Sequence, residues 1–365
     1  MRVNRKKVLK VTAFATLFIV LAFALLVIFT IVRSSSIDKQ ISAFEARRKI
    51  PDSENAAVIY DKLFTDANFT EILEDNIYKQ MTLGEVCYKP WKSKDFPLEA
   101  EFLEKSQIVF PMFNEAAKQD KCVFSFLDMQ KNMGFLGEVR HWVSFLHISA
   151  NNDIGDERFN EAIEKSRLIL KIADHIQQQP IMTYYLVGMA VEALSLSCTK
   201  SIILDPNITE QQLQLVEKLP VKIEDNWDTI SQQIFEGEGY YAGKMLENYP
   251  GITRFVMIFL FRSQTKQVFN KTREINLRFL ADKRGNRILV ALRRYKNRNN
   301  QWPENLEQVK SLVDPNVLID PMNNGSFVYK KTEDGFTLYS RGLNNIDEGG
   351  IFGKGDDWSI WPPPK

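Results

Sequence analysis

The apolar side chains of this chain follow three successive patterns. Residues 11–32 carry no charge, and threonines are their only polar side chains. Through residues 37–282, apolar side chains recur three and four positions apart, which is the spacing of amphipathic helices. After residue 283, one more helical stretch is followed by two short runs in which apolar and polar residues alternate, Ser326–Lys330 and Phe336–Ser340. The Asp-Gly that ends the connection between these runs predicts a β-hairpin.

The first pattern predicts a transmembrane helix. Its 22 residues would extend about 33 Å as an α-helix, enough to cross a hydrocarbon core of about 30 Å. The run is longer than the apolar part of a cleavable signal peptide. Because five basic residues precede it, we expect a cytoplasmic N-terminus and a periplasmic or otherwise extracytoplasmic C-terminal part. Residues 11–32 would then contact the lipid bilayer as a single-pass anchor in the cell membrane.

Two other apolar runs, Ile181–Cys198 and Phe255–Phe261, are predicted to lie in the protein core. Glu192 near the middle of the first run would be costly inside a bilayer, whereas a helical bundle can accommodate it. The second run is too short to span a membrane. Docking on the membrane surface is the alternative for that run.

Local signals predict several helix ends in the middle of the chain. Thr209 and Gln212 have the spacing of a capping box. The turn-forming residues 150–156 (ANNDIGD) predict the end of one helix, and Asp156 is the expected N-cap of the next. These signals indicate antiparallel helices joined by short turns.

Composition places the chain among globular proteins. Of its 365 residues, 44% are hydrophobic and 25% charged, which excludes a disordered chain and a polytopic membrane protein. Three cysteines are too few for a disulfide framework, and a bridge between Cys87 and Cys122 is left open. We predict a mainly α fold in three parts: a basic tip and signal anchor at 1–36, an α-helical exported domain at 37–282 and a small α+β module with a β-hairpin at 283–365.

Positive charge is concentrated in residues 262–298, which hold twelve basic and two acidic side chains. In a part of the chain that lies across the membrane, this stretch does not predict a nucleic-acid partner. We expect it to pair with the chain's own acidic tail. Anionic lipid and an acidic protein partner are the alternatives.

Few residues have the spacing of a catalytic or cofactor site. Glu138 and His141 share a helix face, but a single Glu-x-x-His does not make a zinc or di-iron site. Residues 237–244 (GEGYYAGK) look like a phosphate-binding loop, yet Glu238 stands where such a loop needs glycine, so no nucleotide is predicted. His175, at a helix end, is expected to interact with the helix dipole or to lie at the surface.

The last part of the chain contains an ordered series of short motifs: Tyr295-Lys296, Trp302-Pro303-Glu304-Asn305-Leu306, Asp320-Pro321, Phe327-Val328-Tyr329, Asp334-Gly335-Phe336, Leu338-Tyr339-Ser340-Arg341-Gly342 and Asp347-Glu348-Gly349-Gly350. This series resembles the C-terminal module of the major type II secretion pseudopilins. The whole chain is also similar to a group of single-span bacterial envelope proteins with a helical middle part.

The resemblance implies a calcium ion in the loop after the Tyr-Ser-x-Gly motif. Carried over to this chain, the ligands would be the Arg341 carbonyl, Asn344, Asp347, and Asp356 or Asp357. Oxygen ligands spread over a flexible loop suit calcium. Asn344 stands where the resembled module has an aspartate, which removes one charge. A solvated acidic turn is the alternative interpretation of this loop.

Together these patterns predict a membrane-anchored, non-enzymatic scaffold or interaction protein of the cell envelope, with another envelope protein as its partner. The resemblance adds secretion or pilus-like machinery as the setting. The alternative is a membrane-tethered enzyme with a site in the helical domain near Glu138, His141 and Glu192.

Overall fold

The computed structural model describes residues 39–40, 42–63, 65–124, 129–246, 249, 251–350 and 355–363, without the side chains of 129–133, 251–252, 254–255 and 258–266. The predicted anchor at residues 11–32 lies outside the described residues. Within them the chain is mainly helical and ends in a three-stranded antiparallel sheet. This confirms the mainly α class and the small C-terminal sheet.

The elements follow one another along the chain as a set of α-helices, short 3-10 helices and strands. The α-helices are α2 (Ala56–Leu63), α3 (Ala67–Glu74), α4 (Asn76–Leu83), α5 (Pro97–Lys105), α6 (Phe110–Ala117), α7 (Met129–Gly155), α8 (Phe159–Gln177), α9 (Met182–Leu204), α10 (Glu210–Glu217), α11 (Trp227–Met245) and α12 (Gly251–Asn299). The 3-10 helices are η1 (Asp52–Glu54), η2 (Glu85–Cys87), η3 (Ser106–Val109), η4 (Leu306–Leu312) and η5 (Pro315–Leu318). The strands are β1 (Val328–Lys331), β2 (Phe336–Ser340) and β3 (Trp358–Trp361). Residues 42–48 are helical as well.

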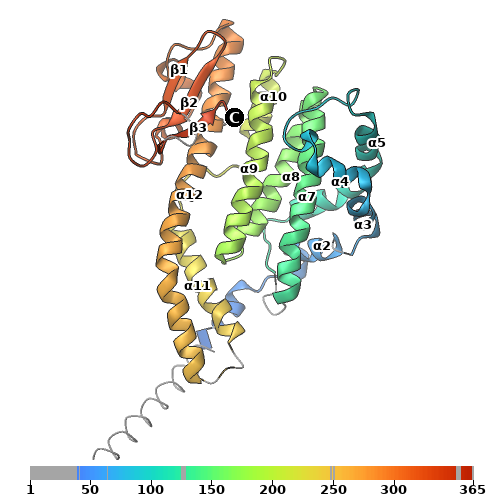
Figure 1. Cartoon of the computed structure of the whole chain (residues 1–365), viewed down its shortest axis with the longest axis vertical. Helices are drawn as coiled ribbons and strands as arrows, with labels where there is room; N and C mark the ends of the chain where they lie inside the picture. Colours follow the sequence, from blue (N-terminus) through green and yellow to red (C-terminus); the bar gives the residue numbers. More distant parts are fainter. Residues whose placement is uncertain are drawn as a thin grey trace, which may run out of the picture.

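The long helices form the centre of the molecule. Helices α7, α8 and α9 lie side by side, and α12 packs along α9 (Figure 1). The short helices α2–α6 cover the side of α7 and α8 that faces away from α12 (Figure 1). Their core is rich in aromatic side chains, and the ring of Trp142 in α7 stacks 5.7 Å from that of Tyr60 in α2. Helix α9 is thus surrounded by α7, α8 and α12, as predicted for a core helix.

The predicted hairpin is confirmed. Strands β1 and β2 pair in antiparallel register, from Val328 opposite Tyr339 to Lys331 opposite Phe336. The third strand, β3, was not predicted and pairs with β2 on its other side.

The sheet packs on the second half of α12 (Figure 1). Gly285 of α12 makes this possible, since a Cβ there would lie 2.5 Å from the side chain of Ile360 in β3. Buried residues of the sheet, of α12 and of α8–α10 form one continuous apolar cluster. Helix α12 also runs without a break through the domain boundary predicted after residue 282.

The local helix signals have mixed outcomes. The capping box is confirmed, because the Thr209 hydroxyl accepts a hydrogen bond from the N–H of Gln212 and the Gln212 side-chain oxygen accepts one from the N–H of Thr209. The long helix does end within the predicted stretch 150–156, although α7 continues to Gly155, near the end of that stretch. Asp156 is not an N-cap: α8 begins at Phe159, without any side-chain cap. Tertiary contacts of residues 152–158 override the local preference.

Candidate functional site

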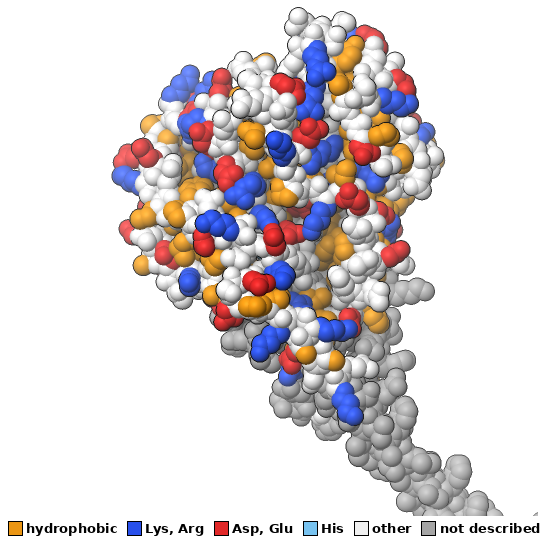
Figure 2. Space-filling view, turned by 180° about the vertical axis from the view of Figure 1, so that it is seen from behind, with side chains coloured by type: hydrophobic (Ala, Val, Ile, Leu, Met, Phe, Trp, Pro, Cys, Tyr) orange, Lys and Arg blue, Asp and Glu red, His pale blue; other side chains and the backbone are white. Residues whose placement is uncertain are grey.

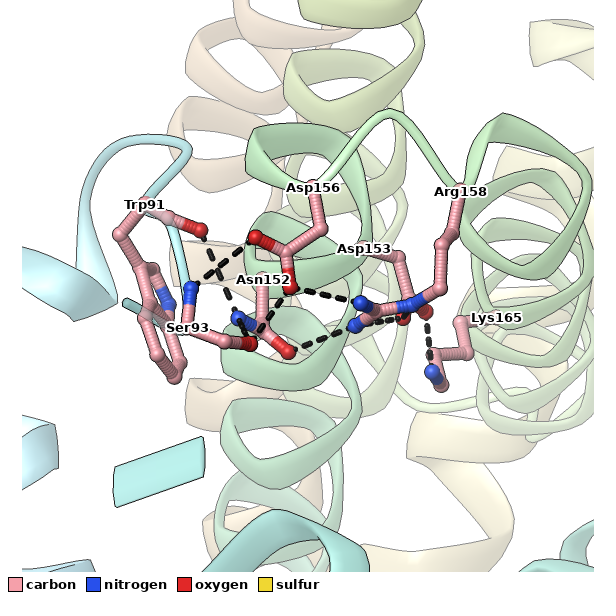
Figure 3. A network of polar contacts seen from close by, with 7 residues as sticks. All are labelled: Trp91, Ser93, Asn152, Asp153, Asp156, Arg158 and Lys165. Atoms are coloured by element: carbon pink, nitrogen blue, oxygen red, sulfur yellow. Dashed lines mark hydrogen bonds and ion pairs between the residues drawn. The ribbon is translucent and has the colours of Figure 1, made fainter. Parts of the chain in front are cut away.

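A network of charged and polar side chains surrounds the turn between α7 and α8 (Figure 3). Asp153, in the last turn of α7, is buried and forms ion pairs with Arg158 at 2.8 Å and with Lys165 of α8. Burial raises the pKa of Asp153 above its ordinary value, although both cations oppose this. The two cations balance the charge of the Asp153 carboxylate, and these ion pairs hold α7 to α8.

The same network reaches the segment that follows η2. The carboxylate of Asp156 accepts hydrogen bonds from the N–H of Ser93 at 3.0 Å and from Arg158 at 2.6 Å. Although burial opposes ionisation, the hydrogen bonds from Ser93 and Arg158 lower the pKa of Asp156. Gly155 lets the two segments touch, because a Cβ there would lie 2.0 Å from the carbonyl oxygen of Trp91. The turn-like sequence 150–156 therefore serves this contact and does not end the helix early.

A second polar cluster joins α7 to α9 and contains a cysteine, a histidine and an asparagine. His147 Nδ1 lies 3.2 Å from the Sγ of Cys198, and its Nε2 lies 3.4 Å from the amide nitrogen of Asn151. All three side chains are buried. Burial raises the pKa of Cys198 to about 12 and lowers that of His147 to about 4.

With these pKa values, the cluster at neutral pH consists of a neutral thiol beside a neutral imidazole. A nucleophilic cysteine requires a thiolate, which an imidazolium stabilises in catalytic pairs. Here burial disfavours both charged forms, so the cluster stabilises the α7–α9 interface. Sequence spacing did not reveal it, since 51 residues separate Cys198 from His147. The four-residue spacing of His147 and Asn151 was the available local signal.

The three residues of the predicted enzyme site have separate surroundings. Glu138 and His141 are half-buried on α7, where the backbone carbonyl of His141 accepts a hydrogen bond from the hydroxyl of Tyr78 at 2.9 Å. Glu192 is buried on α9 and forms an ion pair with Lys283 of α12 at 2.9 Å. The hydrogen bond and ion pair of Glu192 lead to Gln177 and Lys283, away from Tyr78, which binds His141.

His175 is buried, so its predicted surface position is wrong. Its Nε2 lies 2.9 Å from the backbone carbonyl of Gln119, and its Nδ1 lies 2.8 Å from the hydroxyl of Tyr60. A carbonyl only accepts, so Nε2 carries the proton and Nδ1 accepts from Tyr60. Burial lowers the pKa of His175. Its polar ring links α8 to α2 and to the segment after α6.

The glycine-rich residues 237–244 lie within α11 and have a packing role. A Cβ at Gly237 would lie 1.9 Å from the carbonyl oxygen of Pro180, so only glycine lets α11 approach the turn before α9. Glu238 accepts a hydrogen bond from the N–H of Met182 at 2.8 Å. Met182 is the first residue of α9, where backbone N–H groups lack partners within the helix. The stretch therefore caps α9 and is not a phosphate loop.

Two basic residues of α12 bind backbone carbonyls at the ends of other helices, and Arg294 pairs with Glu210 and Glu217 of α10. Arg293 donates from Nε to the carbonyl of Ile203 at 2.8 Å, at the end of α9, and Arg287 donates to the carbonyl of Leu219 at 3.0 Å, just beyond α10. Such carbonyls lack partners within their helix and carry partial negative charge. Among the described side chains of the stretch, only Arg278 forms an ion pair with the acidic tail, with Asp356 at 3.2 Å. On the face seen in Figure 2, cationic and anionic side chains are interspersed.

The predicted calcium ligands lie in the loop between β2 and β3, where most of their oxygens already accept hydrogen bonds. Asp347 accepts from the hydroxyl of Tyr339 at 2.7 Å and pairs with Lys330 at 3.2 Å. Asp356 accepts from the N–H of Asn344 at 3.1 Å. Among the described residues, no group of three or more His, Cys, Asp or Glu side chains is placed to hold a metal ion.

Asp357 is the exception in this loop. Its Oδ2 accepts from the N–H groups of Glu348 at 2.9 Å and Gly350 at 2.7 Å. Its Oδ1 is buried and has no hydrogen-bond partner among the described residues. A buried carboxylate oxygen without a donor fits a cation ligand, so this one atom agrees with the calcium prediction.

An open cleft of about 430 Å³ lies between residues 44–50 and the turn that joins α8 to α9. Arg48 donates to Gln179 at 2.8 Å within it, and burial lowers the pKa of Arg48 to about 10. Arg47 at its edge pairs with Glu236 of α11 at 2.6 Å. The cleft therefore marks where the segment after the predicted anchor attaches to the helical body.

Three further findings concern the chain as a whole. Comparison with family models, with curated proteins and with solved structures finds no match to this chain. Among the described residues, Met182–Leu204 is long and apolar enough to cross a membrane, and 56% of its apolar window is buried within the fold. All three cysteines are free thiols.

Proposed function

We propose that this protein is a membrane-anchored, non-enzymatic scaffold of the cell envelope that presents its C-terminal module to another envelope protein. In this proposal residues 11–32 cross the membrane once, the N-terminus is cytoplasmic and the described part is extracytoplasmic. Secretion or pilus-like machinery is the proposed setting, on the strength of the resemblance of residues 295–350 to pseudopilin modules.

The observation that carries the proposal is the arrangement of the two ends of α12. Residues 42–48, which follow the predicted anchor, pack on α11 beside the first half of α12, and the sheet packs on its second half (Figure 1). The 34 residue steps from Gly251 to Gly285 correspond to about 51 Å of helix. A continuous helix of this length would hold the module at a distance from the membrane.

The interior polar groups give further support. Asp153, Glu192, His147 and His175 each pair with side chains or backbone groups of neighbouring elements. Side chains used in this way fix helix contacts and are not free to bind or activate a substrate. Rigidity along the length of the molecule is what a scaffold requires.

Labelling of neighbouring proteins in cells tests this proposal. We expect a peroxidase fused after Lys365 to biotinylate extracytoplasmic envelope proteins, with at least one partner enriched over a control in which residues 1–36 alone carry the peroxidase. The reason is that the control has the same membrane and topology but lacks the module. Mass spectrometry of the biotinylated proteins makes the measurement. Labelling of cytoplasmic proteins would overturn the topology, and identical labelling by the two fusions would overturn the scaffold role.

We also propose that Asp357, with Asn344, Asp347 and Asp356 nearby in the same loop, holds calcium. Calcium that binds only the folded loop should stabilise the protein, by about 2.7 kcal/mol at 100 times its dissociation constant. We expect Asp357→Asn to remove most of this gain, because it removes charge from the oxygen that lacks a donor. Thermal unfolding of the full chain with and without calcium measures the effect.

The matched control for this experiment is Asp334→Ala, since Asp334 is an exposed acid in the turn between β1 and β2. That variant should keep the full response to calcium. Magnesium should replace calcium poorly, because it requires a tighter octahedral geometry. If calcium leaves the melting temperature unchanged, the loop does not hold calcium, and its carboxylates serve in hydrogen bonds within the tail.

A further inference from the structure

Six exposed apolar side chains lie on α11, on the first part of α12 and at Tyr249 between the two helices. They are Phe235 (44% exposed), Met245 (53%), Tyr249 (52%), Val256 (47%), Met257 (43%) and Val268 (47%). Burial of such side chains is favourable by about 25 cal/mol per Å² of apolar surface removed from water. The predicted core position of Phe255–Phe261 is wrong for Val256 and Met257, the two residues of this run whose side chains the structure describes.

The end of the molecule that these helices form is also the end to which the predicted anchor is attached. The ring of Phe44 stacks 4.9 Å from that of Tyr240 in α11, and Arg47 pairs with Glu236 of the same helix. Seven residue steps separate Val32, the last residue of the anchor, from Lys39. Even fully extended they reach about 25 Å. Helix α11 therefore lies close to the bilayer whenever residues 11–32 span it.

The sequence at this end has the charge that a lipid surface attracts. Residues 244–271 hold five basic side chains and one acidic side chain, and two of the basic residues, Arg254 and Arg262, bracket the run FVMIFLF. An apolar run flanked by basic residues is the pattern of segments that lie in the membrane interface. Juxtamembrane basic residues are attracted to anionic lipid headgroups.

We propose that the end of the molecule that carries the exposed side chains of Met245, Tyr249, Val256 and Met257 docks on the membrane surface as a second lipid contact beside the transmembrane anchor. The proposal rests on the anchoring at residues 11–32 and adds an orientation to it. With two contacts, α12 is held at a fixed angle to the bilayer, which a single anchor does not set. The occupant of the apolar surface is the anionic phospholipid bilayer.

Depth-dependent fluorescence quenching tests the proposal with the full chain. Met257→Cys, in a Cys87→Ser background, carries an environment-sensitive fluorophore, while Cys122 and Cys198 are buried and stay unlabelled. The chain is reconstituted in vesicles of phosphatidylcholine and phosphatidylglycerol that contain nitroxide-labelled lipids. We expect blue-shifted emission and quenching several-fold stronger than at the control site, Ile275→Cys. Ile275 is 46% exposed on the same helix, about 27 Å further along it.

Each outcome separates docking from anchoring. Equally weak quenching at residues 257 and 275, in protein that floats with the vesicles, would overturn docking and leave the anchor intact. Failure of the chain to float with vesicles would overturn both. Blue-shifted emission without quenching by lipid, rising with the protein-to-lipid ratio, would assign the surface to a second copy of the chain. A fluorophore at Val256→Cys should repeat the result for Met257→Cys and thereby exclude an effect of that one substitution.

Discussion

Glu192→Ala should lower the free energy of unfolding by about 3–5 kcal/mol, because removing one partner of a buried ion pair leaves the other charge buried and unpaired. Glu192 and Lys283 are 2.9 Å apart, with side chains 7% and 12% exposed. Glu192 also accepts a hydrogen bond from Gln177 of α8 at 3.0 Å. Truncation therefore weakens contacts of α9 with both α8 and α12. Urea denaturation followed by circular dichroism measures the loss.

The matched control for Glu192→Ala removes both charges together. We expect the double variant Glu192→Leu with Lys283→Met to be close to the native protein in stability, since apolar replacement of a whole buried pair is often neutral or stabilising. A wild-type stability for Glu192→Ala itself would show that the pair does not hold α9 to α12. Glu192 would then again be a candidate for a functional carboxylate.

Acidification should destabilise the protein through His147. In the unfolded chain this histidine takes up a proton near its ordinary pKa of 6.5, whereas burial lowers the pKa in the folded state to about 4. The stability that depends on neutral His147 is fully present above pH 6.5 and is lost as the pH falls toward 4. One pKa unit corresponds to about 1.4 kcal/mol, so the loss reaches about 3 kcal/mol.

The difference between native protein and a His147→Gln variant isolates this contribution. His175 also has a lowered pKa and acts in the same direction, while the raised pKa values of Asp153 and Asp320 act in the opposite one. These groups are common to both proteins, so they cancel in the difference. We expect the variant to be less stable at pH 7 and to lose less stability on acidification. Parallel stability curves for the two proteins from pH 7 to pH 4.5 would contradict the assignment.

Features that depend on a few neighbouring residues were predicted correctly. The capping box at Thr209 and Gln212 and the hairpin around Asp334-Gly335 are both present, because their hydrogen bonds lie within a few residues of one another. Asp156 was wrongly predicted as the N-cap of α8 for the opposite reason. Asn152 and Asp156 are turn formers in isolation, yet here they bind Ser93, which is some 60 residues away in the chain.

The candidate sites likewise depend on contacts between residues that are far apart in the sequence. Sequence spacing offered Glu138, His141 and Glu192 as one group, but a shared helix face says nothing about which other helices lie opposite it. The closest cysteine–histidine contact, between Cys198 and His147, joins two helices that meet only in the folded chain. Burial keeps both side chains neutral, because neither ionises readily out of water.

The sequence by itself determined the helical class, the hairpin and the uncharged run at 11–32, since periodicity and turn chemistry are properties of short segments. Only the tertiary structure decided how the charges of α12 are used. Arg287 and Arg293 were expected to face an acidic tail, and they bind carbonyl groups at the ends of α10 and α9. Unpaired carbonyls are present at the end of every helix and leave no mark in the sequence. Which basic residue satisfies them depends on how the helices pack.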